Sequence, residues 1–336
     1  MKKIGLLFVF TVLIGSLVGC GAKEEKEKKV TIAFPSGGGS FAGGVLGEAD
    51  VQGYLKQYLE PLGYEVCLES FPGAAPAIHE ALISKEIDYV VYAGMAGVLG
   101  KSNGIDTKLL AVTGYACSWR LVVRNDANIQ SLQDLEGKKI AYARGASPHL
   151  YFIHVLEQAG IRFEQVEAYN MTLADGLSAL AAGSVDAAIV TAGQEEELVK
   201  EGIVTVLHNG YEQGDTFYEP MVLIGESQAL KEKKDATVAV IVALLRARDE
   251  IAKDREAFYQ LSEEQSGHSL EVVKATSPQN IEIGYPVNLE NRYLDSLKQI
   301  QKTLIKEELI TKEMNIMDWI DDSFLKEARK EYQNEE

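Results

Sequence analysis

The segment PLGYEVCLESFPGAAPAIHEALISKEIDYV, residues 61–90, carries the pattern on which the predicted fold rests. Its β-branched and aromatic residues predict a strand over Tyr64–Phe71, and a short helix is predicted over Pro76–Ser84. A second apolar run predicts another strand over Asp88–Ala93. Strands that alternate with helices indicate α/β layers around a mostly parallel sheet.

The same alternation continues on both sides of this segment. Apolar stripes at helical spacing predict helices over Leu46–Leu62, Pro148–Ala159, Thr172–Ala182 and Gln194–Glu201. From Gln228 onward the chain is predicted to be nearly all helical. Further strands are predicted over Val30–Phe34, Leu109–Tyr115, Leu121–Val123, Lys139–Ala143, Gln165–Tyr169, Ala187–Thr191, Val204–Leu207 and Tyr218–Ile224.

Two series of strands followed by a helical end indicate two lobes, with the chain crossing between them twice. We expect the outward crossing near Cys117–Leu121 and the return near Gln213–Tyr218. Lobes joined in this way can close on a ligand by hinge motion. The expected organisation is a signal peptide (1–19), a lipidated cysteine with a charged tether (20–29), the first part of lobe 1 (30–118), lobe 2 (119–216), and a return to lobe 1 with the C-terminal helices (217–336).

The N-terminus predicts export and a lipid anchor. A basic start, Met1-Lys2-Lys3, precedes an uncharged run over Ile4–Gly19 that is shorter than the ~20 residues of a membrane-spanning helix. Leu17-Val18-Gly19-Cys20 resembles the bacterial lipobox, in which the cysteine carries the lipid. A plain signal peptide with a chance cysteine and an uncleaved anchor are the alternatives. We therefore expect a protein held on the extracytoplasmic face of the cell membrane through Cys20.

Composition excludes several classes of function. The formal net charge is −17 and no basic stripe is present, which argues against a nucleic-acid surface. The five histidines show no i, i+4 pair, and Cys67 and Cys117 form no CxxC motif, so no metal site is predicted. We expect both cysteines to be free and mostly buried. No catalytic constellation and no cofactor site are predicted.

Three segments together resemble one family. They are residues 61–90, quoted above, SLQDLEGKKIAYARGASPHLYFIHVLEQAGI (131–161) and LSALAAGSVDAAIV (177–190). In this order and spacing they resemble the substrate-binding proteins of ABC importers for aliphatic sulfonates, nitrate and taurine, a group that includes thiamine-precursor binders. The resemblance covers about Val30 to Tyr218. It implies a two-lobed fold like that of the type II periplasmic binding proteins.

The chain departs from this family pattern at two places. After Val-Asp-Ala, the family often has a run with a large aromatic ligand contact, whereas residues 189–194 here read IVTAGQ. The loop after the first strand is also richer in glycine than the family pattern. Both departures concern the identity of the ligand and leave the implied transport role in place.

That first loop, FPSGGGSFAGG (34–44), is a candidate binding loop. It partly fits a dinucleotide fingerprint, with Glu69 near the place of the expected acidic residue, and it is close to a nucleophile-elbow pattern. An exported protein meets no pool of NAD, and the loop lacks the Gly-Lys-Ser/Thr of a nucleotide-binding loop. Ligand binding without chemistry is the favoured interpretation, with a purely structural turn as the alternative. The candidate ligand contacts are Ser36, Gly37, Gly38, Gly39, Ser40 and Phe41.

Further candidates lie where other predicted strands end, because ligands bind at that edge of open α/β sheets. Ser147 suits either a helix N-cap before Pro148 or a ligand contact. His149 matches the family's histidine position, and both a ligand contact and a helix-packing role stay open. The other candidates at strand ends are Gly73, Ala74, Gly94, Met95, Thr172 and Thr191.

The predicted crossings supply the last candidates. Arg120 either pairs with an anionic ligand or forms an ion pair between the lobes. Trp119 either stacks on a ring or packs at the hinge, and Tyr218 is placed similarly on the return crossing. If Glu219 faces the ligand, a cationic or amine-bearing ligand is favoured.

The resemblance implies a monomeric receptor that traps a small solute and delivers it to an ABC permease and its ATPase. The leading ligand is a small anion of the sulfonate, nitrate or taurine type. A thiamine-type pyrimidine is second, on the aromatic residues Trp119, Phe41 and Tyr218. An extracellular enzyme or a sensory module on the same fold is the competing class.

Overall fold

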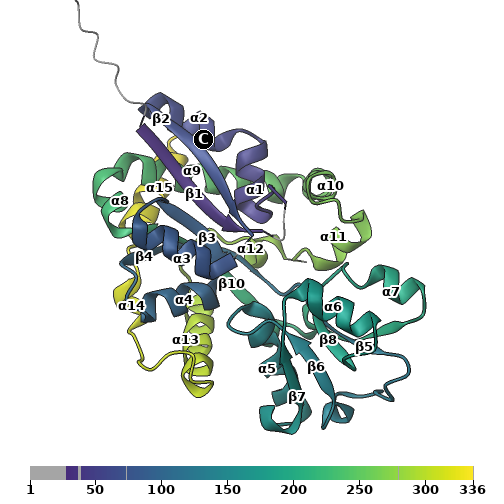
Figure 1. The fold of residues 1–336 in the computed structure, drawn as a ribbon. Helices are drawn as coiled ribbons and strands as arrows, with labels where there is room; N and C mark the ends of the chain where they lie inside the picture. Colours follow the sequence, from purple (N-terminus) through teal and green to yellow (C-terminus); the bar gives the residue numbers. More distant parts are fainter. Residues whose placement is uncertain (1–27, 37–38, 73, 279, 336) are drawn as a thin grey trace, which may run out of the picture.

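The structure is a computed structural model that describes residues 28–36, 39–72, 74–278 and 280–335. It contains two five-stranded sheets, each covered by helices on both faces, which form two lobes (Figure 1). This arrangement confirms the predicted two-lobed α/β fold. Within the described ranges, no helix combines the length and apolarity that crossing a membrane requires.

The sheet of lobe 1 has the strand order β2-β1-β3-β10-β4. β1 pairs in parallel with β2 and with β3, whereas β10 is antiparallel to both of its neighbours. Segment 61–90 thus forms two parallel strands with a helix between them, as its sequence predicts. The strands are β1 (Lys28–Pro35), β2 (Tyr64–Phe71), β3 (Tyr89–Ala93), β4 (Thr107–Ala116) and β10 (Glu219–Glu226).

The sheet of lobe 2 repeats this plan with the order β7-β6-β8-β5-β9. Here β5 is the antiparallel strand. In each sheet the antiparallel strand is the first one after a crossing between the lobes. The strands are β5 (Trp119–Arg124), β6 (Lys139–Tyr142), β7 (Glu167–Asn170), β8 (Ala187–Thr191) and β9 (Val204–Asn209).

Most helices belong to lobe 1. They are α1 (Gly44–Val51), α2 (Tyr54–Leu59), α3 (Ala74–Ser84), α4 (Gly94–Ser102), α8 (Ser227–Glu232), α9 (Lys234–Lys253), α10 (Arg255–Ser266), α11 (Leu270–Thr276), α12 (Ile281–Gly284), α13 (Asn291–Lys306), α14 (Ile316–Trp319) and α15 (Ser323–Gln333). Lobe 2 carries α5 (Ser147–Ala159), α6 (Leu173–Ala181) and α7 (Glu196–Lys200). The return crossing contains two short 3₁₀ helices, η4 (Gly210–Gln213) and η5 (Asp215–Phe217).

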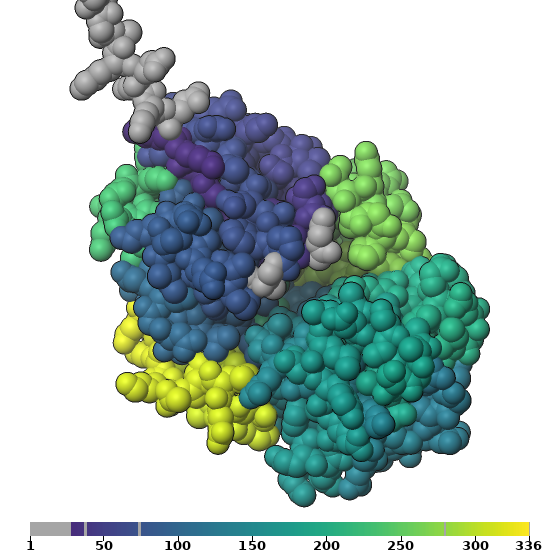
Figure 2. Space-filling view, viewed as in Figure 1, coloured from purple at the N-terminus to yellow at the C-terminus, as the bar shows by residue number. Residues whose placement is uncertain are grey.

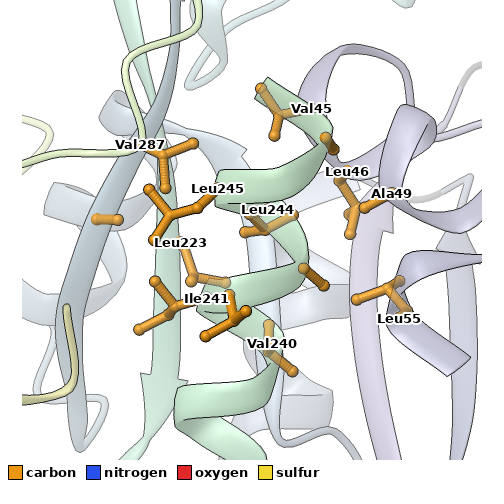
Figure 3. Packing of buried hydrophobic residues seen from close by; sticks show 14 of the residues in the cluster. Val45, Leu46, Ala49, Leu55, Leu223, Val240, Ile241, Leu244, Leu245 and Val287 are labelled. Atoms are coloured by element: carbon orange, nitrogen blue, oxygen red, sulfur yellow. The ribbon is translucent and has the colours of Figure 1, made fainter. Parts of the chain in front are cut away.

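Burial on both faces explains why the central strands read as continuous apolar runs. In β3, Tyr89 and Val91 pack with α1, α2 and α9, whereas Val90 and Tyr92 pack on the other face with α3, α4 and α13. β10 alternates in the same way. The long helix α9 supplies the centre of the first cluster, where its residues meet side chains from α1, α2 and β10 (Figure 3).

Three details of the sequence prediction were wrong. The predicted helix over Leu46–Leu62 is broken at Gln52-Gly53, where Gly53 takes a φ of 76° and α2 begins anew. No helix is predicted directly after the strand Asp88–Ala93, yet Gly94 begins a nine-residue helix, α4. β1 begins at Lys28, so Lys28 and Lys29 belong to the sheet and not to the charged tether. Both cysteines are free, as predicted, with Cys117 buried and Cys67 half-buried.

Candidate ligand-binding site

The carboxyl ends of the parallel strands lead to the boundary between the lobes. Figure 2 shows a groove on the visible face, between the purple and blue surface of lobe 1 and the teal surface of lobe 2. The chain crosses between the lobes at Cys117-Ser118 and returns through η4 and η5. Glu219 pairs with Ala116, so the two crossings lie side by side.

Glu219 lies where the two lobes meet. Its Oε1 accepts a hydrogen bond from the backbone N–H of Met95 at 2.7 Å, at the start of α4 in lobe 1. Ser147, at the start of α5 in lobe 2, lies near enough to this carboxylate to lower its pKa. Burial raises the pKa of Glu219 to about 6, and the neighbouring Met95 N–H and Ser147 side chain oppose this shift. The side chain is 8% exposed.

This carboxylate occupies the place that an anionic ligand would take at the N-terminus of α4, since helix N-termini attract anions. Met95, a predicted ligand contact, is buried and its N–H is bonded to Glu219. Gly94 is required by packing: a Cβ there would lie 2.6 Å from Leu297 Cδ2 and 3.0 Å from the Pro220 carbonyl oxygen. These two residues serve the interior of lobe 1.

The structure corrects the predicted start of α5. Ala146 is the N-cap, and Ser147 is the first helical residue rather than the cap. His149 is buried, its Nδ1 accepts from the N–H of Gly145 at 3.3 Å, and its ring lies 5.0 Å from that of Tyr142. Burial lowers the pKa of His149 to about 4, and nearby Arg144 adds to the shift. These contacts are those of a helix-packing residue.

Arg120 forms an ion pair with the buried carboxylate of Glu195. Both residues belong to lobe 2, so the alternative of an ion pair between the lobes was wrong. Glu195 also accepts a hydrogen bond from the N–H of Gly193 at 2.9 Å. Among the described residues, the Nε of Arg120 is buried without a hydrogen-bond partner. Trp119 is half-buried against the apolar core of lobe 2.

The glycine-rich loop leads into a helix that has no side-chain cap. Gly43 and Gly44 have φ values of 68° and 52°, a region that glycine adopts at low cost. No side chain of the described residues caps α1. Phe41 packs on this helix, because a Cβ on Gly47 would lie 2.5 Å from its ring.

The rest of this loop is open where it is described. Ser40 is exposed, and a Cβ on Gly39 would meet no atom within 4 Å. The N–H of Ser36 donates to the carbonyl of Phe71 at 3.2 Å and ties the end of β1 to the end of β2. Ala74 is the first residue of α3. The candidates Cys20, Gly37, Gly38 and Gly73 lie outside the described residues.

The remaining candidates, Thr172, Thr191 and Tyr218, form hydrogen bonds with residues close to them in sequence. Thr172 caps α6 by accepting from the N–H of Asp175 at 3.1 Å. The N–H of Thr191 donates to the Gln194 side chain at 3.1 Å. Tyr218 donates from its hydroxyl to the carbonyl of Tyr211 at 3.0 Å. The N-termini of α1 and of α5 both lack a side-chain cap, and of the two α1 is the one that follows the glycine-rich loop.

Sequence reasoning missed the part played by Glu195 and did not settle the orientation of Glu219. The run Glu195-Glu196-Glu197 is typical of a solvated helix start, because consecutive glutamates usually face water, yet Glu195 is buried. The only signal was its position just after a strand, beside Gly193 with a φ of 97°. Within the described ranges, no group of His, Cys, Asp and Glu is arranged to hold a metal ion.

Comparison with known families and proteins gives consistent matches. A family model described as NMT1/THI5 like matches residues 71–257. A relative from Escherichia coli strain K12, named as an aliphatic sulfonates-binding protein, is 25% identical over 254 residues, 75% of this chain and 73% of that protein. A relative of the same description from Bacillus subtilis strain 168 is 25% identical over 347 residues, 99% of this chain and 98% of that protein.

Solved structures share the fold. The periplasmic sulfonate-binding protein of a sulfonate ABC transporter from Methylobacillus flagellatus KT superposes with a TM-score of 0.77 at 20% identity, covering 91% of this chain and 95% of that one. The alkanesulfonate-binding protein of Xanthomonas axonopodis pv. citri, solved with MOPS bound, gives 0.71 at 20% identity and covers 88% and 98%. The desulfurization enzyme DSZB gives 0.70 at 16% identity and covers 91% and 99%. The fold therefore supports both binding proteins and an enzyme.

Proposed function

The chain belongs to the NMT1/THI5-like family, and from this premise we propose that it is an extracytoplasmic solute-binding protein that captures a small anion of the sulfonate type for an ABC importer. The names of both curated relatives, which describe binding proteins for aliphatic sulfonates, support this choice of ligand. The proposed lobes are residues 30–118 with 217–336 and residues 119–216.

The observation that carries the proposal is the state of the helix N-termini at the boundary between the lobes. Glu219 occupies the N-terminus of α4, and the Thr172 side chain caps α6. Among the described residues neither α1 nor α5 has a side-chain cap. At α1 the N-cap Gly43 and the first helical residue Gly44 both have positive φ and no side chain, which lets a ligand approach the backbone. A sulfonate accepts several hydrogen bonds and carries one negative charge, so it suits the N–H groups at this end of α1.

Capture would proceed by closure of lobe 2 onto lobe 1. The α1 end of lobe 1 would hold the anionic head, and residues at the carboxyl edge of lobe 2 would complete the site. A ligand favours the closed form only by the difference between its affinities for the closed and open forms. Closure would then give the permease a shape by which to recognise the loaded receptor.

We also propose that Cys20 anchors the protein in the membrane as a lipidated cysteine. The lipobox-like sequence Leu17-Val18-Gly19-Cys20 supports this. Metabolic labelling with a palmitate analogue tests the anchor: wild type incorporates the label and Cys20→Ala does not. Equal labelling of the two proteins would refute lipidation at this residue.

The ligand is tested by thermal unfolding of the full chain carrying Cys20→Ser, with a panel of methanesulfonate, taurine, nitrate and a thiamine-type pyrimidine. A ligand at ~100 times its Kd stabilises the folded state by about 2.7 kcal/mol. We expect the sulfonates to raise the Tm and to be recovered unchanged after incubation, as binding without turnover requires. A shift by the pyrimidine alone would refute the sulfonate assignment, and a changed product would refute binding without chemistry.

A further inference from the structure

The loop between β8 and α7, residues 192–195, is organised around a buried carboxylate. The side chain of Glu195 is paired with Arg120, the second residue of β5, and Glu195 is only 1% exposed. The same carboxylate accepts a hydrogen bond from the N–H of Gly193 at 2.9 Å. Glu195 therefore ties the loop after β8 to the strand that follows the outward crossing.

Further hydrogen bonds within lobe 2 fix the backbone of this β8–α7 loop. The N–H of Thr191 donates to the side chain of Gln194 at 3.1 Å, and the N–H of Gln194 donates to the carbonyl of Thr191 at 3.1 Å. The N–H of Ala192 donates to the carbonyl of Ser118, in the outward crossing, at 2.8 Å. Since these N–H groups are already bonded within lobe 2, the loop meets lobe 1 by packing.

Gly193 of this loop lies against lobe 1. A Cβ on Gly193 would be 3.1 Å from Val272 Cγ1 in α11 and 3.3 Å from His268 Nδ1, just before α11. Val272 is buried, and Gly193 has a φ of 97°. Figure 2 shows the light-green surface of α10 and α11 meeting the teal surface of lobe 2. The β8–α7 loop and α11 therefore touch across the boundary between the lobes.

Helix α11 also meets the return crossing at its other end. The carbonyl of Ser277, the residue that follows this helix, accepts a hydrogen bond from the hydroxyl of Tyr211 in η4. Lobe 2 and the return crossing thus contact α11 at both ends. Because packed atoms resist overlap, the position of the β8–α7 loop limits how near α11 can come to lobe 2.

We infer that Glu195 is a positioning residue, which together with Arg120 holds the β8–α7 loop as a stop for α11. The stop determines the separation at which the two lobes come to rest, and so the fit of a ligand held between them. A buried ion pair suits this role, because each charge needs its partner once both are removed from water. The inference rests on the closure mechanism in the proposed function.

Gly193→Ala tests the stop by enlarging it. The distance between spin labels at Lys56→Cys in lobe 1 and Glu164→Cys in lobe 2, both exposed sites, reports the separation of the lobes. The labels are placed in the full chain carrying Cys20→Ser and Cys67→Ser. We expect a longer label distance without ligand. Methanesulfonate should bind several-fold more weakly, because the apparent affinity falls with the fraction of molecules that can close.

Two further variants separate this contact from backbone strain. Gly202, just after α7 in lobe 2, also has a positive φ, 70°, but a Cβ there would meet no atom within 4 Å. Gly202→Ala therefore carries a similar backbone cost and should leave the label distance unchanged. Adding Val272→Ala to Gly193→Ala removes the atom nearest to the new Cβ, so it should restore most of the wild-type distance.

Glu195→Gln tests the positioning role, because it keeps the shape of the side chain and removes its charge. We expect a broader distribution of label distances, since the loop is held less firmly. Arg120→Met combined with Glu195→Gln leaves no charge of this pair unpaired, so this variant should fold and show the same broadening. The control Asp88→Asn breaks the ion pair with Lys233 within lobe 1, and it should lower the Tm without broadening the distribution.

Equal label distances in Gly193→Ala and Gly202→Ala would overturn the stop. An unchanged distribution in both Glu195 variants would overturn the positioning role. These readouts need no ligand, so a failure of wild type to bind methanesulfonate would count against the proposed function and not against the stop. A longer distance in Gly193→Ala with wild-type affinity for methanesulfonate would refute the claim that the stop determines the fit of the ligand.

Discussion

His149 is a buried histidine whose protonation opposes folding. Its pKa is lowered to about 4 in the folded protein, against about 6.5 in the unfolded chain. Between these values the unfolded state binds a proton that the folded state does not, so the free energy of unfolding falls as the pH falls through this window. His149 alone then costs about 3 kcal/mol of stability by pH 4.

Urea unfolding at pH 7 and pH 4.5 checks this prediction. His149→Asn keeps an acceptor near the position of Nδ1 but cannot take up a proton, so it should lose less stability than wild type between the two pH values. The expected difference is about 2 kcal/mol or more. Equal losses in the two proteins would show that His149 does not carry the effect.

At the scale of single residues, the sequence predicted where Arg120 and Glu219 lie in the fold better than it predicted which residues they contact. It predicted Arg120 and Glu219 at the crossings, and in the structure each lies in the strand that follows a crossing, β5 and β10. The partner of Arg120 is Glu195, 75 residues away along the chain. Glu219 accepts from the N–H of Met95, 124 residues away along the chain. No local pattern encodes such pairs, because they arise only when the sheets are assembled.

Helix α4 shows how a glycine can be needed for packing. The Cβ in Gly94→Ala would meet Leu297 of α13 at 2.6 Å and the Pro220 carbonyl oxygen at 3.0 Å. Inserting a methyl group into a filled interior costs about 1 to 3 kcal/mol. We expect Gly94→Ala to lower the free energy of unfolding by this amount in urea titrations. In Gly39→Ala the added Cβ meets no atom within 4 Å, so equal losses in the two variants would contradict the packing account.

Helix α1 gives an electrostatic test of the proposed site. Ser40 is exposed on the loop that leads to the uncapped end of this helix. Ser40→Asp would place a negative charge there, whereas Ser40→Asn has nearly the same shape without the charge. Calorimetric titration with methanesulfonate should show several-fold weaker binding to the Asp variant than to the Asn variant, with a smaller difference at high salt. Equal affinities would place the anionic head away from α1.

Most elements were predictable because apolar runs and glycine signals are local. β2 and β8 have the bounds that the sequence predicts. The helices α5 and α6 each begin within one residue of their own predicted starts. The break at Gly53 was missed because the apolar stripe of Leu55 and Leu59 continues that of α1 in register. α4 was missed because its sequence, GMAGVLGKS, is rich in glycine, which disfavours helices. Its packing against α13 and β10 supplies the stability that its own residues lack.

At the scale of the whole molecule, the two-lobed architecture followed from the two series of strands and the helical end. Each sheet takes its antiparallel strand from the segment that follows a crossing, β5 in lobe 2 and β10 in lobe 1. The contacts between the lobes could not be predicted, since each joins segments far apart in sequence, such as Tyr211 with Ser277 and Lys306 with Glu157. These contacts determine how the lobes are oriented relative to each other. That orientation determines where an anion can bind between them.

The most direct test of the central claim is a crystal structure of the protein grown with methanesulfonate. The account predicts electron density for the sulfonate between the lobes, with its oxygens within hydrogen-bond distance of the N–H groups that begin α1, and with Glu219 still bonded to Met95. A sulfonate found at the start of α4 with Glu219 displaced, or bound outside the groove between the lobes, would contradict it.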